Sequence, residues 1–348
     1  MKDEQCRTLA AYGTIVTSAW ALGRLLRARR RISFRNRVVL ISGGSRGLGL
    51  VLARRLAREG AHLVLLARTP ADLDAARWDL EAEGAQVLTP PCDVRDRRAV
   101  DAAVRAAVER FGQIDVLLHV AGIIQFAPLA HHTRADFEES LGVHFWGAYH
   151  LTEAVRPFLP RDGSGRIVYV SSFGGRVAAP HMSAYAVGKF ALVGYADAMR
   201  TELAREGIRV TTVTPGLMRT GSHVNAFFKG QHEKEYAWFS ILDASPFASA
   251  SVESAARQIL DACRHGDAAL TITLRAHVLA ALNGITPGLV GALMKGANRL
   301  LPEPTGPAGD EKRSGWESFS ERSPSFLTRL ADREAAENNE LRGHAPPA

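Results

Sequence analysis

The sequence contains few cysteines, and its uncharged N-terminal run is short for a membrane span. Its three cysteines, Cys6, Cys92 and Cys263, are too few and too scattered for a disulfide framework or a zinc site. We therefore expect a reducing, cytoplasmic setting and no bound metal. The uncharged run over residues 8–23 is diluted by Thr, Ser and Gly, whereas a span needs about 20 strongly apolar residues. Arginines follow this run where a signal peptide would have its cleavage site.

Acidic residues are also scarce at the N-terminus. Residues 1–37 hold nine basic and two acidic side chains, and the remaining 311 residues hold 34 of each sign. The net charge of +7 therefore belongs to a short arm, which does not indicate a nucleic-acid-binding domain. An apolar run followed by arginines favours a helix at an anionic membrane surface. Packing of this arm, residues 1–35, on the protein or on a second subunit is the alternative, and a true span is the least favoured.

Short β-branched apolar runs alternate with helical stretches from residue 36 to residue 273. Each run is apolar at consecutive positions, as expected when helices cover both faces of a parallel sheet. This alternation predicts an α/β fold with a Rossmann-like, doubly wound parallel sheet of about seven strands. The expected strands cover 38–41, 63–66, 86–88, 116–120, 167–170, 210–213 and 270–273, with helices between them such as 50–58, 72–83, 97–111 and 184–205.

Two further segments follow the expected sheet. Residues 274–301 are apolar but interrupted at Asn283-Gly284 and at Thr286-Pro287-Gly288, which predicts two short helices. Residues 302–348 hold six of the sixteen prolines and many charges, which predicts a disordered tail. A short helix starting at Pro324, with Ser323 as its N-cap, is the one element expected there.

A glycine-rich turn joins the first expected strand to the helix that follows. Glycines at such a joint allow a tight turn, and they bring backbone N–H groups and the helix N-terminus against a pyrophosphate. Many turns contain glycine clusters, but this one lies between a buried strand and a helix near the start of the domain. The residues expected to contact a dinucleotide here are Gly43, Ser45, Arg46, Gly47, Leu48 and Gly49.

Basic side chains stand where the adenine ribose of a dinucleotide would lie. After the second strand, an acidic residue would accept from the ribose 2′-hydroxyl, whereas a cation suits a 2′-phosphate. Arg68 follows that strand, and Arg46 lies in the glycine-rich turn. The two arginines favour NADP(H) over NAD(H), unless both are solvated surface residues. Asp93 and Val94, after the third strand, are expected beside the adenine.

The strongest chemical signal is a tyrosine followed four residues later by a lysine. Tyr185 and Lys189 share one helix face, and Ser172 precedes Tyr185 by thirteen residues at the end of a strand. A nearby ammonium stabilises a tyrosinate and would lower the phenol pKa from its usual value of about 10. Tyr185 is therefore expected to act as a general acid or base on a carbonyl/alcohol pair, with Ser172 bonded to the same oxygen.

Taken in this order, these motifs resemble the short-chain dehydrogenase/reductase family. The resemblance covers roughly residues 36–273 and includes Pro215-Gly216 after the sixth strand. It implies an enzyme that passes a hydride between the nicotinamide C4 and a carbinol carbon, and that forms a homo-oligomer. It further implies cofactor contacts from Ala121, Gly122, Thr220 and Lys189, the last through the nicotinamide ribose. The two extensions loosely resemble those of membrane-associated hydroxysteroid-dehydrogenase-type members.

Two residues depart from the family's pattern. The family's Asn-Asn-Ala-Gly segment is His119-Val120-Ala121-Gly122 here, and His144 replaces the helix Asn that completes the proton relay. A neutral imidazole has one donor and one acceptor, so His144 can hold the water that the Asn holds. The alternative is an impaired relay with low activity.

The segment over residues 217–251 occupies the position of the family's mobile lid. Its aromatic and aliphatic content suits a lipophilic ketone or secondary alcohol, unless these side chains cover the sheet edge or an oligomer interface. The function expected is therefore an NADP(H)-dependent oxidoreductase on such a pair, with peripheral membrane contact through the arm. The alternatives are a 3-oxoacyl thioester reductase and a non-catalytic, membrane-recruited NADP-binding module.

Overall fold

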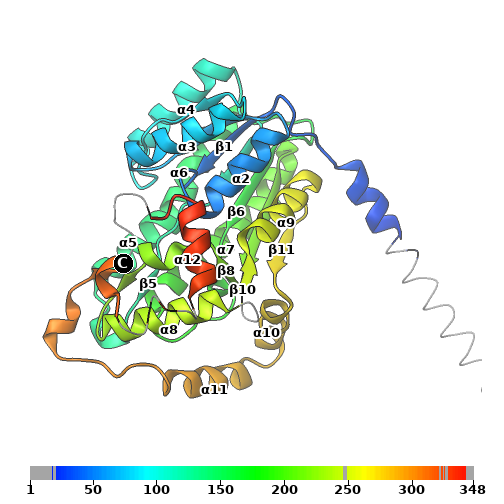
Figure 1. Cartoon of the computed structure of the whole chain (residues 1–348). Helices are drawn as coiled ribbons and strands as arrows, with labels where there is room; N and C mark the ends of the chain where they lie inside the picture. The colour runs from blue at the N-terminus through cyan, green and yellow to red at the C-terminus, as the bar shows by residue number, and fades with distance from the viewer. Residues whose placement is uncertain are drawn as a thin grey trace, which may run out of the picture.

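A seven-stranded parallel sheet forms the centre of the protein (Figure 1). The computed structural model describes residues 18, 21–245, 249–320, 323, 325 and 328–341. The strand order is β11-β7-β6-β4-β1-β2-β3, so the chain winds outward in both directions from β1 and β4. This confirms the predicted Rossmann-like fold and all seven expected strands. The strands are β1 (Val38–Ser42), β2 (His62–Leu66), β3 (Val87–Leu88), β4 (Val116–His119), β6 (Arg166–Val170), β7 (Arg209–Pro215) and β11 (Ala269–Ile272).

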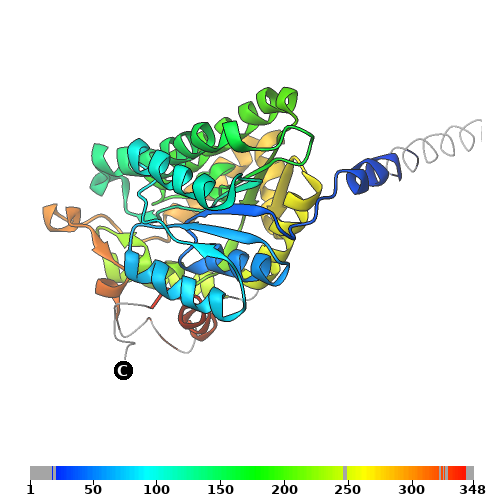
Figure 2. The ribbon, with the colours of Figure 1, turned by 90° about the horizontal axis from the view of Figure 1, so that it is seen from above.

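Helices cover both faces of this sheet, as Figure 2 shows from above. Successive strand side chains point to opposite faces, so Val39 and Ile41 join one core while Val38 and Leu40 join the other. Both sets are buried, which explains why the strands are apolar at consecutive positions. The first core is closed by α2 (Gly47–Arg58), α3 (Pro70–Ala82) and α9 (Val252–His265), and the second by α4 (Arg97–Phe111), α6 (Gly147–Val155) and α7 (Ser183–Leu203).

The segment after β7 forms a small unit of its own against the carboxyl edge of the sheet. It contains β8 (Leu217–Arg219), η6 (Ser222–Asn225), β9 (Phe227–Phe228), α8 (His232–Ala244) and β10 (Ser249–Ser251). Strand β9 lies between β5 (Gln125–Phe126) and β12 (Arg313–Ser314) in a three-stranded sheet. We call residues 217–251 the lid, although residues 246–248 lie outside the described part.

The aromatic side chains of the lid mainly build its own core. Phe228, Tyr236 and Phe239 are buried together, and Phe126 and Phe319 pack against them. This packing joins the lid to the segment after β4 and to the C-terminal region. These three aromatic side chains therefore form buried packing inside the lid, which neither the expected lipophilic substrate surface nor the alternative of a sheet-edge or oligomer cover describes.

The predicted pair of short helices after β11 is present. Helix α10 (Leu274–Ile285) ends at Thr286, and α11 (Pro287–Asn298) begins with Pro287 in its first turn. In the described part of the chain, no helix combines the length and the hydrophobicity needed to cross a membrane.

The prediction of a disordered C-terminal tail is wrong for the residues that the structure describes. Strand β12 pairs with β9, and helix α12 (Arg329–Glu337) packs on the lid with Ala331 and Ala335 fully buried. A Cβ on Gly221 would lie 2.3 Å from the Cα of Ala335, so the two backbones are in direct contact. Because the residues at this contact are small, α12 can pack closely on the lid. This packing gives the segment a defined structure, although its charges and prolines predict disorder. The helix begins at Arg329, later than the expected start at Pro324.

The N-terminal arm is anchored to the domain at its inner end. Residues 21–29 are helical and project from the body (Figure 1), while most of the expected apolar helix over 8–23 lies outside the described residues. Arg27 pairs with Asp267 at 2.7 Å. The fully buried Arg166 donates to the carbonyl of Arg30 at 2.6 Å and to that of Cys263 at 2.9 Å. These bonds tie the basic part of the arm to the end of α9.

Candidate active site

A cavity of about 260 Å³ opens at the carboxyl edge of the sheet, where the loops after β1, β2, β4, β6 and β7 converge. Ser172, Pro215 and Gly216 are the predicted site residues that do not line it. The other predicted residues all do: Gly43, Ser45, Arg46, Gly47, Leu48, Gly49, Arg68, Asp93, Val94, Ala121, Gly122, His144, Tyr185, Lys189 and Thr220. Residues far apart in the sequence therefore meet in one place, as the motifs predict.

The glycine-rich turn lies at one end of the cavity and is too tight for side chains. A Cβ on Gly49 would lie 1.9 Å from the carbonyl oxygen of Gly43, and one on Gly43 would lie 2.9 Å from the backbone of Ala121. Gly43 and Gly47 also have positive φ angles of 72° and 53°. Helix α2 begins at Gly47, which lines the cavity, and has no acidic residue in its first turn, so the positive end of its dipole borders the cavity. This end can hold a phosphate.

Arg46, Arg68 and Asp93 are predicted site residues with charged side chains that line the cavity. Arg46 reaches in from the turn, and Arg68 is exposed at the rim. Asp93 accepts a hydrogen bond from Arg95 at 2.6 Å. Partial burial works to raise the pKa of Asp93, but the bonds from Arg95 outweigh it and leave the pKa below its usual range. Asp93 is therefore charged, in a position that can meet an adenine.

Ser172 and Tyr185 lie side by side next to Gly174, and Tyr185 lines the cavity. A Cβ on Gly174 would lie 3.0 Å from the Tyr185 ring and 3.5 Å from the Ser172 hydroxyl, so the two side chains flank this glycine. Ser172 accepts from the Gly174 N–H at 3.0 Å, which leaves its own proton free to donate. Burial raises the pKa of the Tyr185 phenol to about 12, although a hydrogen bond with Ser172 lowers it. The expectation of a lowered phenol pKa is therefore wrong for this structure.

Lys189 lies on the same face of α7, one turn after Tyr185. Its Nζ is 5.7 Å from the centre of the Tyr185 ring and donates to the carbonyl of Val170 at 3.1 Å. Burial lowers the pKa of Lys189 to about 7. Lys189 can therefore gain and lose a proton near neutral pH.

Replacing Lys189 by Met is expected to stabilise the protein without nucleotide. Because the pKa of Lys189 falls from 10.5 to about 7 on folding, the buried ammonium opposes folding most strongly below pH 7. We expect Lys189→Met to raise the free energy of unfolding at pH 6 by on the order of 2 kcal/mol, measured by urea denaturation. The exposed Lys295→Met is the control, with no change. A loss of stability in Lys189→Met would show that the ammonium is well compensated.

Comparison with known proteins identifies the family. The sequence profile of the short chain dehydrogenase family matches residues 37–229, more than half of the chain. The chain belongs to the short-chain dehydrogenase/reductase family.

Relatives of this short-chain dehydrogenase/reductase match its central region. It is 34% identical over 232 residues to dehydrogenase/reductase SDR family protein 7-like of Anopheles gambiae, or 65% of this chain and 71% of that protein. It is 36% identical over 180 residues to glycine betaine reductase ATRR of Emericella nidulans, or 52% of this chain but 14% of that protein. The chain thus spans a small part of the latter relative.

Solved structures share the fold and include both nicotinamide cofactors. L-Sorbose reductase from Gluconobacter frateurii, complexed with NADPH and L-sorbose, has a TM-score of 0.62 at 26% identity, covering 69% of this chain and 97% of that one. NAD⁺-bound xylitol dehydrogenase has a TM-score of 0.59 at 26% identity, covering 69% of this chain and 99% of that one. Membership in the family supports a nicotinamide-dependent oxidoreductase acting on CH–OH/C=O groups, without deciding between the two cofactors.

His144 of this short-chain dehydrogenase/reductase holds a loop. It lies in a π-helical turn, η2 (Gly142–Trp146), and is fully buried. Its Nε2 accepts from the Ile123 N–H at 3.3 Å, so its Nδ1 carries the proton and bonds the Ser140 hydroxyl at 3.2 Å. Burial, then the charge of Lys189, hold the pKa of His144 well below its usual range. Both ring nitrogens are occupied, so the expectation that His144 holds the relay water is not supported.

His119, the second departure, lies beneath the glycine-rich turn. Its Nδ1 is 2.9 Å from the Ser42 hydroxyl, which also receives the Ala121 N–H at 3.4 Å. Within the described residues, its Nε2 is buried without a partner. Burial, aided by the charge of Lys189, lowers the pKa of His119 to about 3, so it is neutral. His119 therefore links β1 to the loop after β4.

The structure adds two charged residues to the cavity lining that sequence reasoning missed, Asp72 and Glu340. Glu340, from the C-terminal region, lines the cavity beside Arg46. Its side chain is 5% exposed, and its Oε2 lies 3.4 Å from the Arg46 Nε. No local pattern in the sequence marks Glu340 as a site residue, because its place depends on how α12 packs on the lid.

Proposed function

We propose that this short-chain dehydrogenase/reductase interconverts a lipophilic ketone and a secondary alcohol with NADP(H), with Tyr185 as the general acid and base. The observation that carries the proposal is that Tyr185 and Lys189 line the same cavity as a glycine-rich turn and two arginines, while Ser172 is hydrogen-bonded to Tyr185. A dinucleotide in this cavity supplies or accepts the hydride.

The three side chains divide the proton chemistry among them. Ser172 donates a hydrogen bond to the substrate oxygen and holds it near the phenol. Since the pKa of Tyr185 is about 12, its phenol is protonated at neutral pH and is poised to give its proton to a ketone oxygen. Lys189, with a pKa of about 7, can restore that proton. These protonation states suit Tyr185 as the acid in ketone reduction.

The preference for NADP(H) rests on Arg46 and Arg68. Both line the cavity near the positive end of α2, where a 2′-phosphate would add two negative charges. One structural relative binds NADPH and another binds NAD⁺, so the comparison does not decide between them. The preference for NADP(H) therefore rests on the two arginines of this chain. The lipophilic substrate is supported by the apolar side chains around the rest of the cavity, namely Ile123, Ile124, Val143 and Met218.

The test is the oxidation of NADPH with a panel of lipophilic ketones and 3-oxoacyl thioesters, with NADH in parallel. Turnover of ketones with NADPH as the preferred cofactor supports the proposal. Turnover confined to the thioesters would establish the 3-oxoacyl thioester reductase instead. Tight NADPH binding with no turnover would favour the non-catalytic module.

We further propose that α10 and α11 contact an anionic membrane surface. Residues 274–302 include Arg275, Lys295 and Arg299 but no acidic residue. The two helices expose a row of large apolar side chains, which are Leu274, Val278, Leu282, Ile285, Leu289 and Leu293. Exposed leucines flanked only by cations match the interface of an anionic bilayer.

The double substitution Leu289→Asp and Leu293→Asp is expected to reduce binding to phosphatidylglycerol vesicles by about tenfold. The assay is co-sedimentation of the full chain, with phosphatidylcholine vesicles as the neutral comparison. Leu129→Asp, at an exposed leucine outside α10 and α11, is the control and retains binding. Equal sedimentation of all variants would contradict membrane contact through α11.

A further inference from the structure

The nucleotide cavity already contains a carboxyl group that belongs to the chain itself, and burial raises the pKa of this group although the charge of Arg46 opposes that shift. The carboxylate of Glu340 lies against the glycine-rich turn, and a Cβ on Gly47 would lie 2.4 Å from its Oε1. Its Oε2 accepts from the Asn225 side chain at 2.7 Å and faces Arg46 at 3.4 Å. These are the features that suit a phosphate: a glycine surface, the start of α2 and a guanidinium.

Backbone bonds hold Glu340 in this place. The Gly47 N–H, the first of α2, donates to the carbonyl of Asn338 at 2.9 Å, and the Glu340 N–H donates to that of Ala335 at 3.0 Å. Asn225 also donates to the Glu340 carbonyl at 2.9 Å. The segment over residues 338–340 is therefore seated on the turn by its backbone and by a residue of the lid, so the carboxylate has a defined position.

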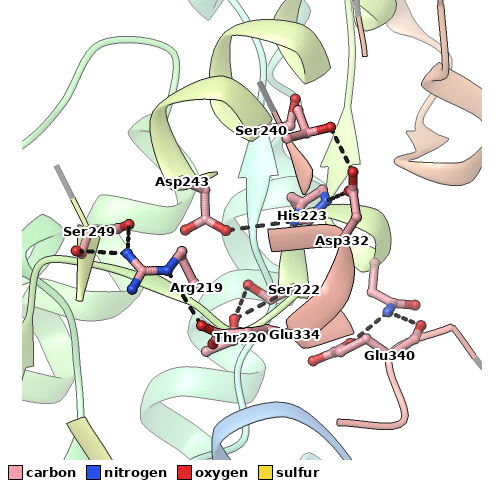
Figure 3. Close-up of polar contacts among 12 residues, drawn as sticks. Arg219, Thr220, Ser222, His223, Ser240, Asp243, Ser249, Asp332, Glu334 and Glu340 are labelled. Carbon is pink, nitrogen blue, oxygen red and sulfur yellow. Dashed lines mark hydrogen bonds and ion pairs between the residues drawn. The ribbon is translucent and has the colours of Figure 1, made fainter. Parts of the chain in front are cut away.

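The lid and α12 are joined by a buried polar interface, shown in Figure 3. His223 lies between Asp243 of the lid and Asp332 of α12, at 3.6 Å and 3.4 Å. Arg219 of the lid lies 3.4 Å from Glu334 of α12. Glu340 is thus carried by an assembly that also supplies Thr220 and Met218 to the cavity.

We propose that Glu340 sets the selectivity between NADP(H) and NAD(H) by competing with the 2′-phosphate for Arg46. This inference rests on the proposed function, since it assigns Arg46 to that phosphate. The carboxylate pairs with Arg46 until the 2′-phosphate of NADP(H) replaces it, so NADP(H) binds more weakly than the two arginines alone would allow. NAD(H) has no 2′-phosphate to compete with Glu340, so its affinity changes little.

The experiment compares the dissociation constants of NADPH and NADH for the full chain and for Glu340→Gln by titration calorimetry. Gln keeps the shape and can still accept from Asn225, but it removes the charge. We expect NADPH to bind about tenfold more tightly to Glu340→Gln, with NADH changed less than about twofold. Glu337→Gln is the matched control, because its side chain pairs with Arg333 on the exposed side of α12.

Each other result overturns the inference. An equal gain for both nucleotides would place Glu340 on the pyrophosphate, and a loss of NADH affinity would make Glu340 an acceptor for the ribose hydroxyl. Unchanged dissociation constants for both nucleotides would show that the contact between Glu340 and Arg46 does not affect nucleotide binding. Turnover of wild-type protein with each nucleotide is measured on the same samples, so failure of the proposed function is seen separately as absent turnover.

Discussion

Tyr185→Phe is expected to lower kcat for ketone reduction by about a thousandfold, because positioned proton transfer contributes about 10²- to 10⁴-fold to such reactions. This substitution removes the phenol hydroxyl. Among the described residues, this hydroxyl is the proton donor that lines the cavity and contacts Ser172. The ring itself stays, so its packing against His144 at 5.5 Å is kept. The dissociation constant of NADPH should therefore remain within about twofold.

Tyr195→Phe is the matched control for this experiment. It lies on the same helix, α7, but packs against Phe145 and Tyr169, away from the cavity. We expect kcat to be unchanged in this variant. Equal losses in both variants would indicate damage to α7, and full activity in Tyr185→Phe would exclude Tyr185 as the proton donor.

His223→Leu is expected to lower the free energy of unfolding by about 3–5 kcal/mol at pH 6, because it leaves the buried Asp243 carboxylate without its cation. His223 and Asp243 are both almost fully buried, in the interface between the lid and α12. Burial lowers the pKa of His223, but Asp243 and Asp332 outweigh it and raise the pKa to about 9. The charged imidazole therefore stabilises the fold.

The pH dependence of this effect has a defined sign. The raised pKa of His223 means that its stabilisation is complete below pH 6.5 and is lost as the pH rises through about 9. Urea denaturation at pH 6 and at pH 10 should therefore show a large difference between wild type and His223→Leu at pH 6 and a smaller one at pH 10. His277→Leu, an exposed histidine on α10, is the control. A difference that does not depend on pH would show that His223 is neutral in the fold.

The central fold could be predicted from local sequence because its signals are local. A strand covered by helices on both faces must be apolar at consecutive positions, and β1 and β2 show this within five residues each. The tight turn at Gly43–Gly49 requires glycine because of its local backbone geometry, whatever the fold of the rest of the chain. Tyr185 and Lys189 share a face because of helix geometry alone.

The properties of the site residues could be predicted less well, because they depend on burial. The proximity of Lys189 to Tyr185 was predicted correctly, but the pKa of the phenol moves upward since burial outweighs the hydrogen bond with Ser172. The role of His144 depends on which groups face its two nitrogens, and Ile123 reaches it from a different loop. Neither result is encoded in the residues adjacent to the motif.

The sequence by itself determined the doubly wound sheet, the nucleotide cavity and the positions of Ser172, Tyr185 and Lys189. Only the tertiary structure decided that the C-terminal region is ordered and that Glu340 lies on Gly47. Strand and turn signals act over a few residues, so composition and spacing reveal them. The contact of Glu340 joins segments almost 300 residues apart, and it forms because α12 buries small residues against the lid, which no local pattern records.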